Sequence, residues 1–261
     1  MICLKRRMSS SSCCSGSSPK SFATGVILTT EAAARGCRGY LAVAGGIDVA
    51  PVLGSRATYV RAAFGGIKGR PLRRGDVVRF GEPSELSHRI ATAIMERAAP
   101  AKIAAGNWSA GPSLIPFFRS GPAIRLIDDE HTALLTGESL ERLIGAEFRV
   151  GPQSDRMGYR LEGPELKLAA PLDLLSEAVA FGTVQLPPGG TPIVLMADRQ
   201  TTGGYPRIGE IASVDLPFVA QLKPGDRLRF RRIPLEEAQQ LYLAREADLA
   251  QARIAIALRH S

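Results

Sequence analysis

The sequence predicts a mainly β protein with two related halves and a helical carboxyl end. Its 261 residues include 27 glycines and 18 prolines, which separate short apolar runs, a pattern typical of strands joined by turns. Segments 72–80 (LRRGDVVRF) and 222–230 (LKPGDRLRF) carry five identical residues at matching positions, which predicts an internal duplication of a β-rich domain. Residues 233–261 are rich in alanine, with acidic residues early and Arg253 and Arg259 late, as expected for a helix.

The first half of the chain is expected to be an incomplete copy. Residues 1–20 are rich in serine and cysteine and lack an apolar pattern, so disorder is expected, with a targeting peptide as the alternative. If the second half begins near Ala123, an equivalent start lies before Met1, so the first copy should lack strands. The expected elements are strands at 24–29 and 39–44, a turn followed by a strand within 72–80, and a helix within 86–105, giving a partial first barrel over 21–105.

The second half is expected to be a complete barrel over residues 123–232, after a linker at 106–122. Thr136 or Ser139 could cap a short helix at 136–144, because Leu140, Leu143 and Ile144 share one face. Strands are expected at 123–126, 148–150, 182–186, 193–196, 208–214 and in the repeat that ends at Phe230.

Composition limits the functional classes. Of the net charge of +8, four charges come from Lys5, Arg6, Arg7 and Lys20, and no stripe of basic and aromatic residues follows, so nucleic-acid binding rests on weak grounds. No apolar run is long enough to span a membrane. The four cysteines all lie within the first 37 residues and do not have zinc-ligand spacing. We therefore expect no metal site and a reducing, cytoplasmic location.

The stretch 198–207 (DRQTTGGYPR) is the strongest candidate for a ligand-binding loop. It follows the apolar run 193–196 and combines two arginines, an aspartate, two threonines and a Gly-Gly pair. Guanidinium groups match carboxylate or phosphate oxygens, and adjacent glycines let backbone N–H groups approach an anion. The alternative is a hairpin turn with an exposed ion pair, which such a composition also fits.

A second loop, 152–160 (PQSDRMGYR), repeats the Asp-Arg pair. We predict that Asp155, Arg156, Asp198 and Arg199 are catalytic, with the arginines binding a carboxylate or phosphate and the aspartates orienting them or accepting a proton. The predicted substrate-binding residues are Gln153, Ser154, Tyr159, Gln185, Gln200, Thr201, Thr202, Gly203, Gly204 and Tyr205.

Three long segments, 39–66, 151–163 and 194–217, resemble the biotin-dependent carboxyltransferase family. That family includes the C-type subunit of bacterial 5-oxoprolinase, the second subunit of allophanate hydrolase and antagonists of sporulation-kinase inhibitors. The resemblance implies tandem cyclophilin-like β-barrels. Family members usually begin with a segment containing TTVQD-like and Gly-Arg-Pro-Gly-Tyr motifs, which this sequence lacks, so the first barrel is again expected to be incomplete.

The resemblance also implies an activity and partners. It suggests a bacterial, ATP-dependent hydrolase that converts 5-oxoproline to glutamate together with A-type and B-type subunits, with ATP bound by the complex and biotin as a further cofactor. A urea or allophanate carboxyltransferase is a second possibility. A non-catalytic role is a third, in which the two loops bind a homologous barrel and the arginines anchor that interface.

Overall fold

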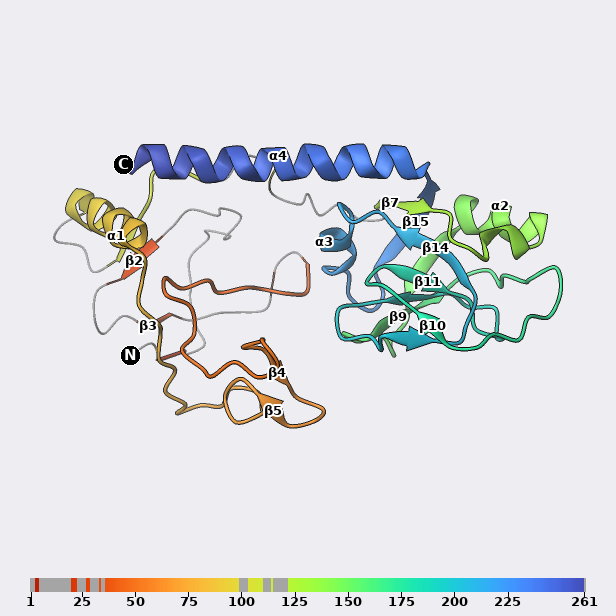
Figure 1. Cartoon of the computed structure of the whole chain (residues 1–261), viewed down its shortest axis with the longest axis horizontal. Helices are drawn as coiled ribbons and strands as arrows, with labels where there is room; N and C mark the ends of the chain where they lie inside the picture. Colours follow the sequence, from red (N-terminus) through yellow and green to blue (C-terminus); the bar gives the residue numbers. More distant parts are fainter. Residues whose placement is uncertain are drawn as a thin grey trace. The chain divides into compact units, whose positions relative to one another are not determined.

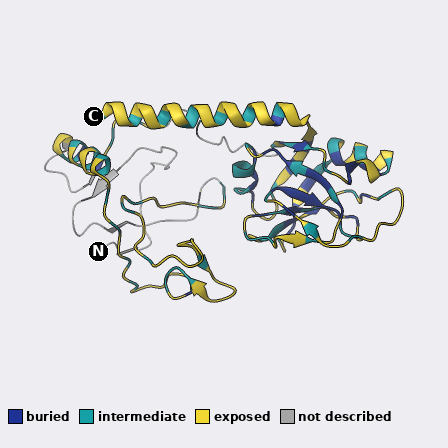
Figure 2. Cartoon of the chain, in the orientation of Figure 1, coloured by how far each residue is buried: buried dark blue, intermediate teal, exposed yellow. Residues whose placement is uncertain are grey.

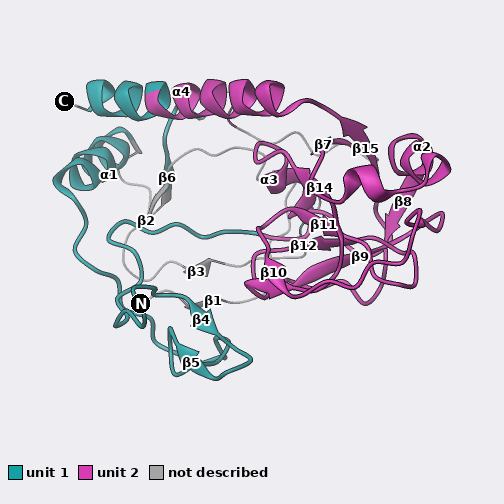
Figure 3. Ribbon diagram, turned by 45° about the vertical axis from the view of Figure 1, so that its right-hand side comes forward, with its two compact units in different colours: residues 1–34, 39–111, 251–261 teal, residues 35–38, 112–250 magenta. Residues whose placement is uncertain are grey.

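The structure is a computed structural model. It describes residues 36–98, 103–109 and 122–260, together with Ala33, Leu114 and the short strands β1 (Cys3–Leu4), β2 (Lys20–Phe22) and β3 (Ile27–Leu28). The predicted disordered segment 1–20 therefore lies almost entirely outside the described residues. The chain divides into two compact units (Figure 3): unit 1 comprises 1–34, 39–111 and 251–261, and unit 2 comprises 35–38 and 112–250.

Unit 2 contains a closed seven-stranded barrel. Its strands are β7 (Ala123–Ile127), β8 (Glu147–Val150), β9 (Gly158–Glu162), β11 (Thr183–Gln185), β12 (Ile193–Leu195), β14 (Arg207–Ile211) and β15 (Arg227–Arg232). Around the barrel they run in the order β11-β12-β9-β8-β15-β7-β14. All neighbours are antiparallel except β15 and β7, which are parallel. The mainly β fold and the barrel are thus confirmed (Figure 1).

The barrel interior holds the hydrophobic core, shown by the dark strands in Figure 2. Alternate residues on each strand point inward, as the two-residue period of a strand requires. Fully enclosed side chains from the strands and from the flanking helices meet there, among them Ile124, Leu143, Phe148, Val150, Val184, Val194, Val219 and Leu228. This core fixes which strand residues face outward, and those residues build the candidate site.

The helices of unit 2 follow local sequence signals. Helix α2 (Gly137–Gly145) begins after Thr136, whose hydroxyl accepts a hydrogen bond from the Ser139 backbone N–H, so Thr136 is the N-cap. The 3-10 turn η2 (Thr132–Leu134) and helix α3 (Leu216–Val219) are short. Helix α4 (Leu235–Arg259) confirms the predicted carboxyl-terminal helix. None of the helices in the described part of the chain is both long and apolar enough to cross a bilayer.

The described residues of unit 1 form little regular structure. They include helix α1 (Glu85–Ala98), as predicted, the two-residue strands β4 (Thr58–Tyr59) and β5 (Phe64–Gly65), and β6 (Ile103–Ala105), which pairs with β2. The strand predicted at 39–44 and the strand predicted after the turn in 72–80 are wrong: residues 39–44 join no strand pair among the described residues, and 72–80 contribute only Phe80, in an isolated bridge with Ile47. Without neighbouring strands their backbone groups have no ladder to join. Their apolar side chains remain exposed, as at Tyr40 and Val77.

The two repeat segments share one local structure. In the first, the Arg73 backbone N–H donates to the Asp76 carboxylate at 2.7 Å, and Gly75 has φ +95°. In the second, the Lys223 N–H donates to Asp226 at 3.0 Å, and Gly225 has φ +94°. The same turn therefore occurs in both halves, but only the second copy continues into a barrel strand, β15.

Candidate functional site

The predicted ligand loop lies against the outside of the barrel. Its strand β13 (Thr202–Gly203) pairs with β10 (Glu177–Ala178), and we call this two-stranded element the covering ribbon. Two backbone hydrogen bonds hold it in place: the Val179 N–H donates to the Thr201 carbonyl at 3.0 Å, and the Leu186 N–H donates to the Pro206 carbonyl at 2.9 Å.

Beneath the ribbon lies a polar layer made of Thr183 and Gln185 from β11 and of Arg207 and Glu210 from β14. Thr183 pairs with Glu210 and Gln185 with Arg207, so all four side chains point to the same face. That face is the outer one, because Val184 between them belongs to the core. Thr183 is only 1% exposed and Gln185 only 5%, so the layer is covered even though it lies outside the barrel.

A bulge in β14 makes this arrangement possible. Val184 pairs with Gly209 while Gln185 pairs with Arg207, so one extra residue, Ile208, is inserted and its side chain enters the core. In a regular strand, residues three positions apart point to opposite faces. The bulge brings Arg207 and Glu210 to one face.

Arg207 is surrounded by carboxylates. Its guanidinium lies 2.5 Å from Glu130, 3.3 Å from Glu177 and 3.6 Å from Asp129. The side chain is 22% exposed, so these contacts are stronger than those of a fully exposed ion pair. One positive charge is shared by three negative ones, so Arg207 is not available to hold an anionic ligand.

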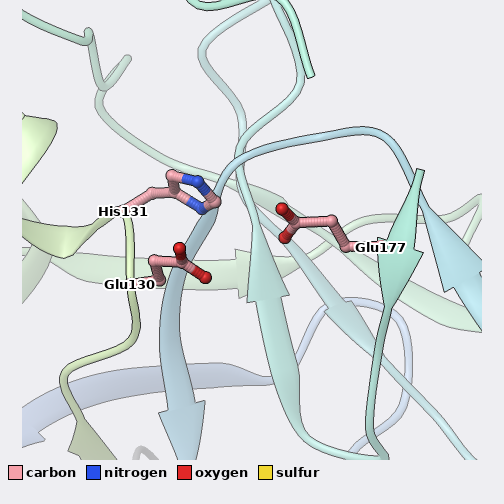
Figure 4. Close-up of side chains that lie close together, drawn as sticks. All are labelled: Glu130, His131 and Glu177. Carbon is pink, nitrogen blue, oxygen red and sulfur yellow. The ribbon is translucent and has the colours of Figure 1, made fainter. Parts of the chain in front are cut away.

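The carboxylates of Glu130 and Glu177 also approach His131 (Figure 4), within the range that could hold a metal ion. The chemistry of the donors argues against one. The Nδ1 atom of His131 accepts a hydrogen bond from the Arg207 backbone N–H at 3.1 Å, so the lone pair of the neutral ring is already used and Nε2 carries the proton. Arg207 supplies the positive charge that a metal would bring.

Glu210 is the residue of the polar layer whose pKa is shifted. Burial raises the pKa of its carboxyl group to about 7, because ionisation in this poorly solvated place is costly. The hydrogen bond with Thr183 and the charges of Arg199 and Arg207 oppose that shift, and Asp129 adds to it. Near neutral pH, Glu210 is therefore present in both its neutral and its charged form.

Arg199 lies at the edge of the polar layer. Its Nε atom donates to the Val179 carbonyl at 3.3 Å, which holds the side chain beside β10. Among the residues described in unit 2, no carboxylate forms an ion pair with it. Arg199 is therefore the arginine of this site whose charge is most available to a ligand.

The two Asp-Arg pairs are joined across the loops. Arg156 donates to the Asp198 carboxylate at 2.9 Å, and the Asp198 N–H donates to the Arg156 carbonyl at 2.8 Å. Asp155 accepts hydrogen bonds from the N–H groups of Met157 and Gly158, which fixes the turn. The structure thus brings the two predicted loops together, but Arg156 and Arg199 bind different partners.

The other predicted residues fall into three groups. Gln185 lies in the polar layer, where its Nε2 donates to the Tyr205 carbonyl at 3.2 Å. Tyr159 is 2% exposed and faces the core side of the barrel wall, with its hydroxyl donating to the Leu222 carbonyl and accepting from Arg38. The rest line the two loops, mostly exposed: Gln153, Ser154, Gln200, Thr201, Thr202, Gly203 and Gly204. Their roles stay predictions.

Sequence reasoning missed several members of the site. From the sequence, Glu210 is predicted only to lie in a strand, His131 lies outside the recognised motifs, and Glu130 and Glu177 have no predicted role. One signal was present: the β14 segment RIGEI places a glutamate within an otherwise apolar strand. A charged residue at such a position must be paired, neutralised or functional.

Comparison with known proteins agrees with the fold and motifs. Residues 11–232 match the family described as carboxyltransferase domain, subdomain A and B. The chain is 36% identical to the C-type subunit of 5-oxoprolinase from Haemophilus influenzae, covering 88% of this chain and 67% of that protein. It is 37% identical to the C-type subunit of 5-oxoprolinase from Escherichia coli, covering 81% of this chain and 61% of that protein.

A solved structure gives the same result. The crystal structure of the Kluyveromyces lactis urea amidolyase superposes with a TM-score of 0.68 at 27% identity, over 82% of this chain and 13% of that one. The chain therefore spans about two thirds of its bacterial relatives and a small part of the yeast enzyme. The family match, the identities and the barrel lead to one conclusion: this chain belongs to the carboxyltransferase domain family, subdomains A and B.

Proposed function

We propose that this chain is a C-type subunit of an ATP-dependent 5-oxoprolinase, which opens the lactam ring of 5-oxoproline to give glutamate. The observation that carries the proposal is the identity of 36% and 37% to the C-type subunits of two 5-oxoprolinases, over most of this chain. The covered polar layer, with Arg199 beside it, supplies groups suited to a small anionic amide. The partners would be the A-type and B-type subunits.

The polar layer does not fit a triphosphate. Asp129, Glu130 and Glu177 surround Arg207, so only Arg199 remains to balance several phosphate charges. A phosphate site normally offers more cations or a run of inward backbone N–H groups. We therefore place ATP elsewhere in the complex and assign this chain a role in holding the amide. Biotin stays a prediction tied to the carboxyltransferase alternative.

In this role the residues of the chain act by binding and orientation. Arg199 binds the substrate carboxylate. Gln185 and the backbone of the covering ribbon limit where the amide can lie. As the ring opens, the amide C–N bond breaks and one water molecule is consumed: its OH bonds to the carbonyl carbon and its remaining hydrogen goes to the nitrogen. Fixed donors near the carbonyl oxygen would stabilise the charge that develops there.

The test is reconstitution with the A-type and B-type subunits. We expect ATP-dependent release of glutamate from 5-oxoproline that requires this chain, and a fall on the order of 100-fold with Arg199→Ala. Arg149→Ala is the matched control, because that arginine lies exposed on β8, distant along the sheet from β14. Full turnover without this chain, or in the Arg199→Ala variant, would refute the assignment.

A non-catalytic role is the second candidate, and one observation favours it. Several large apolar side chains of unit 1 are exposed, including Tyr40 at 85% and Leu53 at 93%. Exposed apolar surface of this kind marks interaction sites. If the chain only binds a partner barrel, it should co-purify with the B-type subunit, and Arg156→Ala together with Arg199→Ala should weaken that binding without changing turnover once the complex is saturated.

A further inference from the structure

Helix α4 has two apolar faces, and described residues of the chain pack against only one of them. On the first face Ala238 is buried, where it packs with Ile233, and Leu241 lies against the same cluster. Near the carboxyl end of the helix, Arg259 donates to the Asn107 side chain at 3.0 Å. The first face is therefore occupied by contacts within the chain.

The second face lies on the opposite side of the helix, because its residues are about half a turn away from Ala238 and Leu241. Its members are separated by steps that alternate between four and three residues, so they share one side of the helix. At a rise of about 1.5 Å per residue, this face is about 22 Å long. We call it the outer stripe, and it consists of Leu243, Ala247, Ala250, Ile254, Ala257 and Leu258.

All six residues of the outer stripe are exposed (Figure 2). The three large side chains are strongly so: Leu243 is 65% exposed, Ile254 59% and Leu258 71%. A surface helix normally places such residues toward a core and polar residues toward solvent. Contiguous exposed apolar surface marks an interaction site. Steps of four and three residues are those by which two helices pack side by side, so the expected occupant is another helix.

The outer stripe matches itself when a second copy of α4 runs in the opposite direction. With a two-fold axis between Ala247 and Ala250, Leu243 meets Ile254 of the second copy, and Ala247 meets Ala250 of the second copy. The larger side chains then pack together on both sides of the axis. The alanines at the centre allow the two helix axes to approach to about 8 Å, the short end of the usual range.

The charged residues beside the outer stripe favour this antiparallel arrangement. Glu246 and Arg253 lie on the same flank of the stripe, and neither forms an ion pair with any residue that the structure describes. A two-fold axis across an antiparallel pair brings this flank against itself, so Glu246 of each copy faces Arg253 of the other. In a parallel pair the flank would face the opposite one, which carries the uncharged residues Ala244 and Gln251.

We propose that the outer stripe of α4 is a docking surface for a second copy of this chain, with the two helices antiparallel. The same surface is used by both copies, so the contact closes on itself and gives a dimer instead of a filament. Two helices in contact over about 22 Å bury less than the roughly 1,200 Å² of a standard interface, so the dimer should depend on concentration. It requires neither the proposed activity nor the other subunits.

Sedimentation equilibrium of the full chain, over about a hundredfold range of concentration, tests the proposal. The average mass should rise toward twice that of one chain. Ala250→Glu places a carboxylate at the centre of the stripe, close to its equivalent in the second copy, and should weaken dimerisation at least tenfold. Ala255→Glu is the matched control: it makes the same substitution at an exposed position of the same helix outside the stripe, and should leave dimerisation within about twofold.

A charge reversal tests the direction of the helices. At low ionic strength, Glu246→Arg replaces both ion pairs by repulsion and should weaken dimerisation on the order of tenfold. Adding Arg253→Glu restores opposite charges in the antiparallel arrangement and should recover the loss.

Three results would overturn the proposal. The first is a chain that stays monomeric at every concentration, and the second is a dimer that Ala250→Glu and Ala255→Glu affect equally. The third is a double variant that dimerises no better than Glu246→Arg, because the antiparallel arrangement would then be wrong.

Discussion

The contact between Gly203 and Gln185 decides whether the covering ribbon can close over the polar layer. A Cβ atom at position 203 would lie 2.5 Å from Gln185 Nε2, about 0.9 Å closer than the 3.4 Å at which ordinary contact begins. Gln185 is nearly enclosed, and its Nε2 already donates to the Tyr205 carbonyl. The Gly203→Ala variant must therefore displace the amide or lift the ribbon.

The cost follows from what is lost. Breaking the bond from Gln185 to Tyr205 and leaving a buried amide without a partner costs about 1–3 kcal/mol. That energy corresponds to a change of about 5- to 150-fold in the equilibrium for opening the ribbon. Hydrogen exchange at the Val179 amide reports the opening directly, because this N–H is bonded to the Thr201 carbonyl.

A neighbouring glycine provides the control. At Gly204 an added Cβ would meet its nearest atom, Ser176 Oγ, at 3.5 Å, an ordinary contact. We expect Gly204→Ala to leave exchange at Val179 within about threefold of the wild type, as for a substitution that adds no clash. If the Val179 amide is equally protected in Gly203→Ala and Gly204→Ala, the ribbon does not rest on Gln185 and the reasoning is refuted.

Three further outcomes are expected. Asp215→Ala should lower the free energy of unfolding of the barrel by about 3–5 kcal/mol, measured by hydrogen exchange in β7, because Arg125 donates to this carboxylate from both backbone and side chain and would be left uncompensated. Glu210→Gln should stabilise the chain by about 1–2 kcal/mol at pH 8 and not below pH 4.5, in urea unfolding, after allowance for partial solvent screening. Gln221→Ala should speed tryptic cleavage after Arg38 several-fold, because three hydrogen bonds hold that segment.

The sign of the pH effect follows from where the proton is held. The folded chain keeps the Glu210 proton up to about pH 7, while an unfolded chain releases it near pH 4.5, so wild-type stability falls as the pH rises through this window. If the stability of Glu210→Gln fell with pH in the same way as that of the wild type, Glu210 would not be the group responsible for the pH dependence. Glu138→Ala is the control for Asp215→Ala. It removes an exposed ion pair and should lower the free energy of unfolding by less than about 1 kcal/mol. Unchanged tryptic cleavage in Gln221→Ala would show that other contacts hold Arg38.

Local signals in the sequence were sufficient for most of unit 2. The N-cap at Thr136 and the apolar runs that form β8, β11 and β12 are short-range features of the sequence. The core residues of these strands follow from the alternation of side chains between the two faces of a strand. Unit 1 could not be predicted in the same way. The runs at 39–44 and 72–80 have strand-like composition, but a strand requires a partner, and composition does not reveal whether one is present.

The candidate site was only partly accessible to sequence reasoning. The loop 198–207 was identified from its own residues, because their types are unusual together. The groups that it covers come from segments far apart in the chain, and the link from Arg156 to Asp198 joins residues 42 positions apart rather than neighbours. Adjacent Asp-Arg pairs in a sequence suggest local pairing, whereas the backbone turn and the second loop decided the actual partners.

The extra residue Ile208 affects how related sequences are compared. If a related protein lacked the residue that corresponds to Ile208, its arginine and glutamate would stand two positions apart, and a regular strand would still point both to the same face. If it kept three-residue spacing but paired without the bulge, one of the two side chains would turn toward the barrel interior. Relatives should therefore be compared by the spacing of these two residues together with the pairing of the strand, since the two features jointly decide whether both side chains share the outer face.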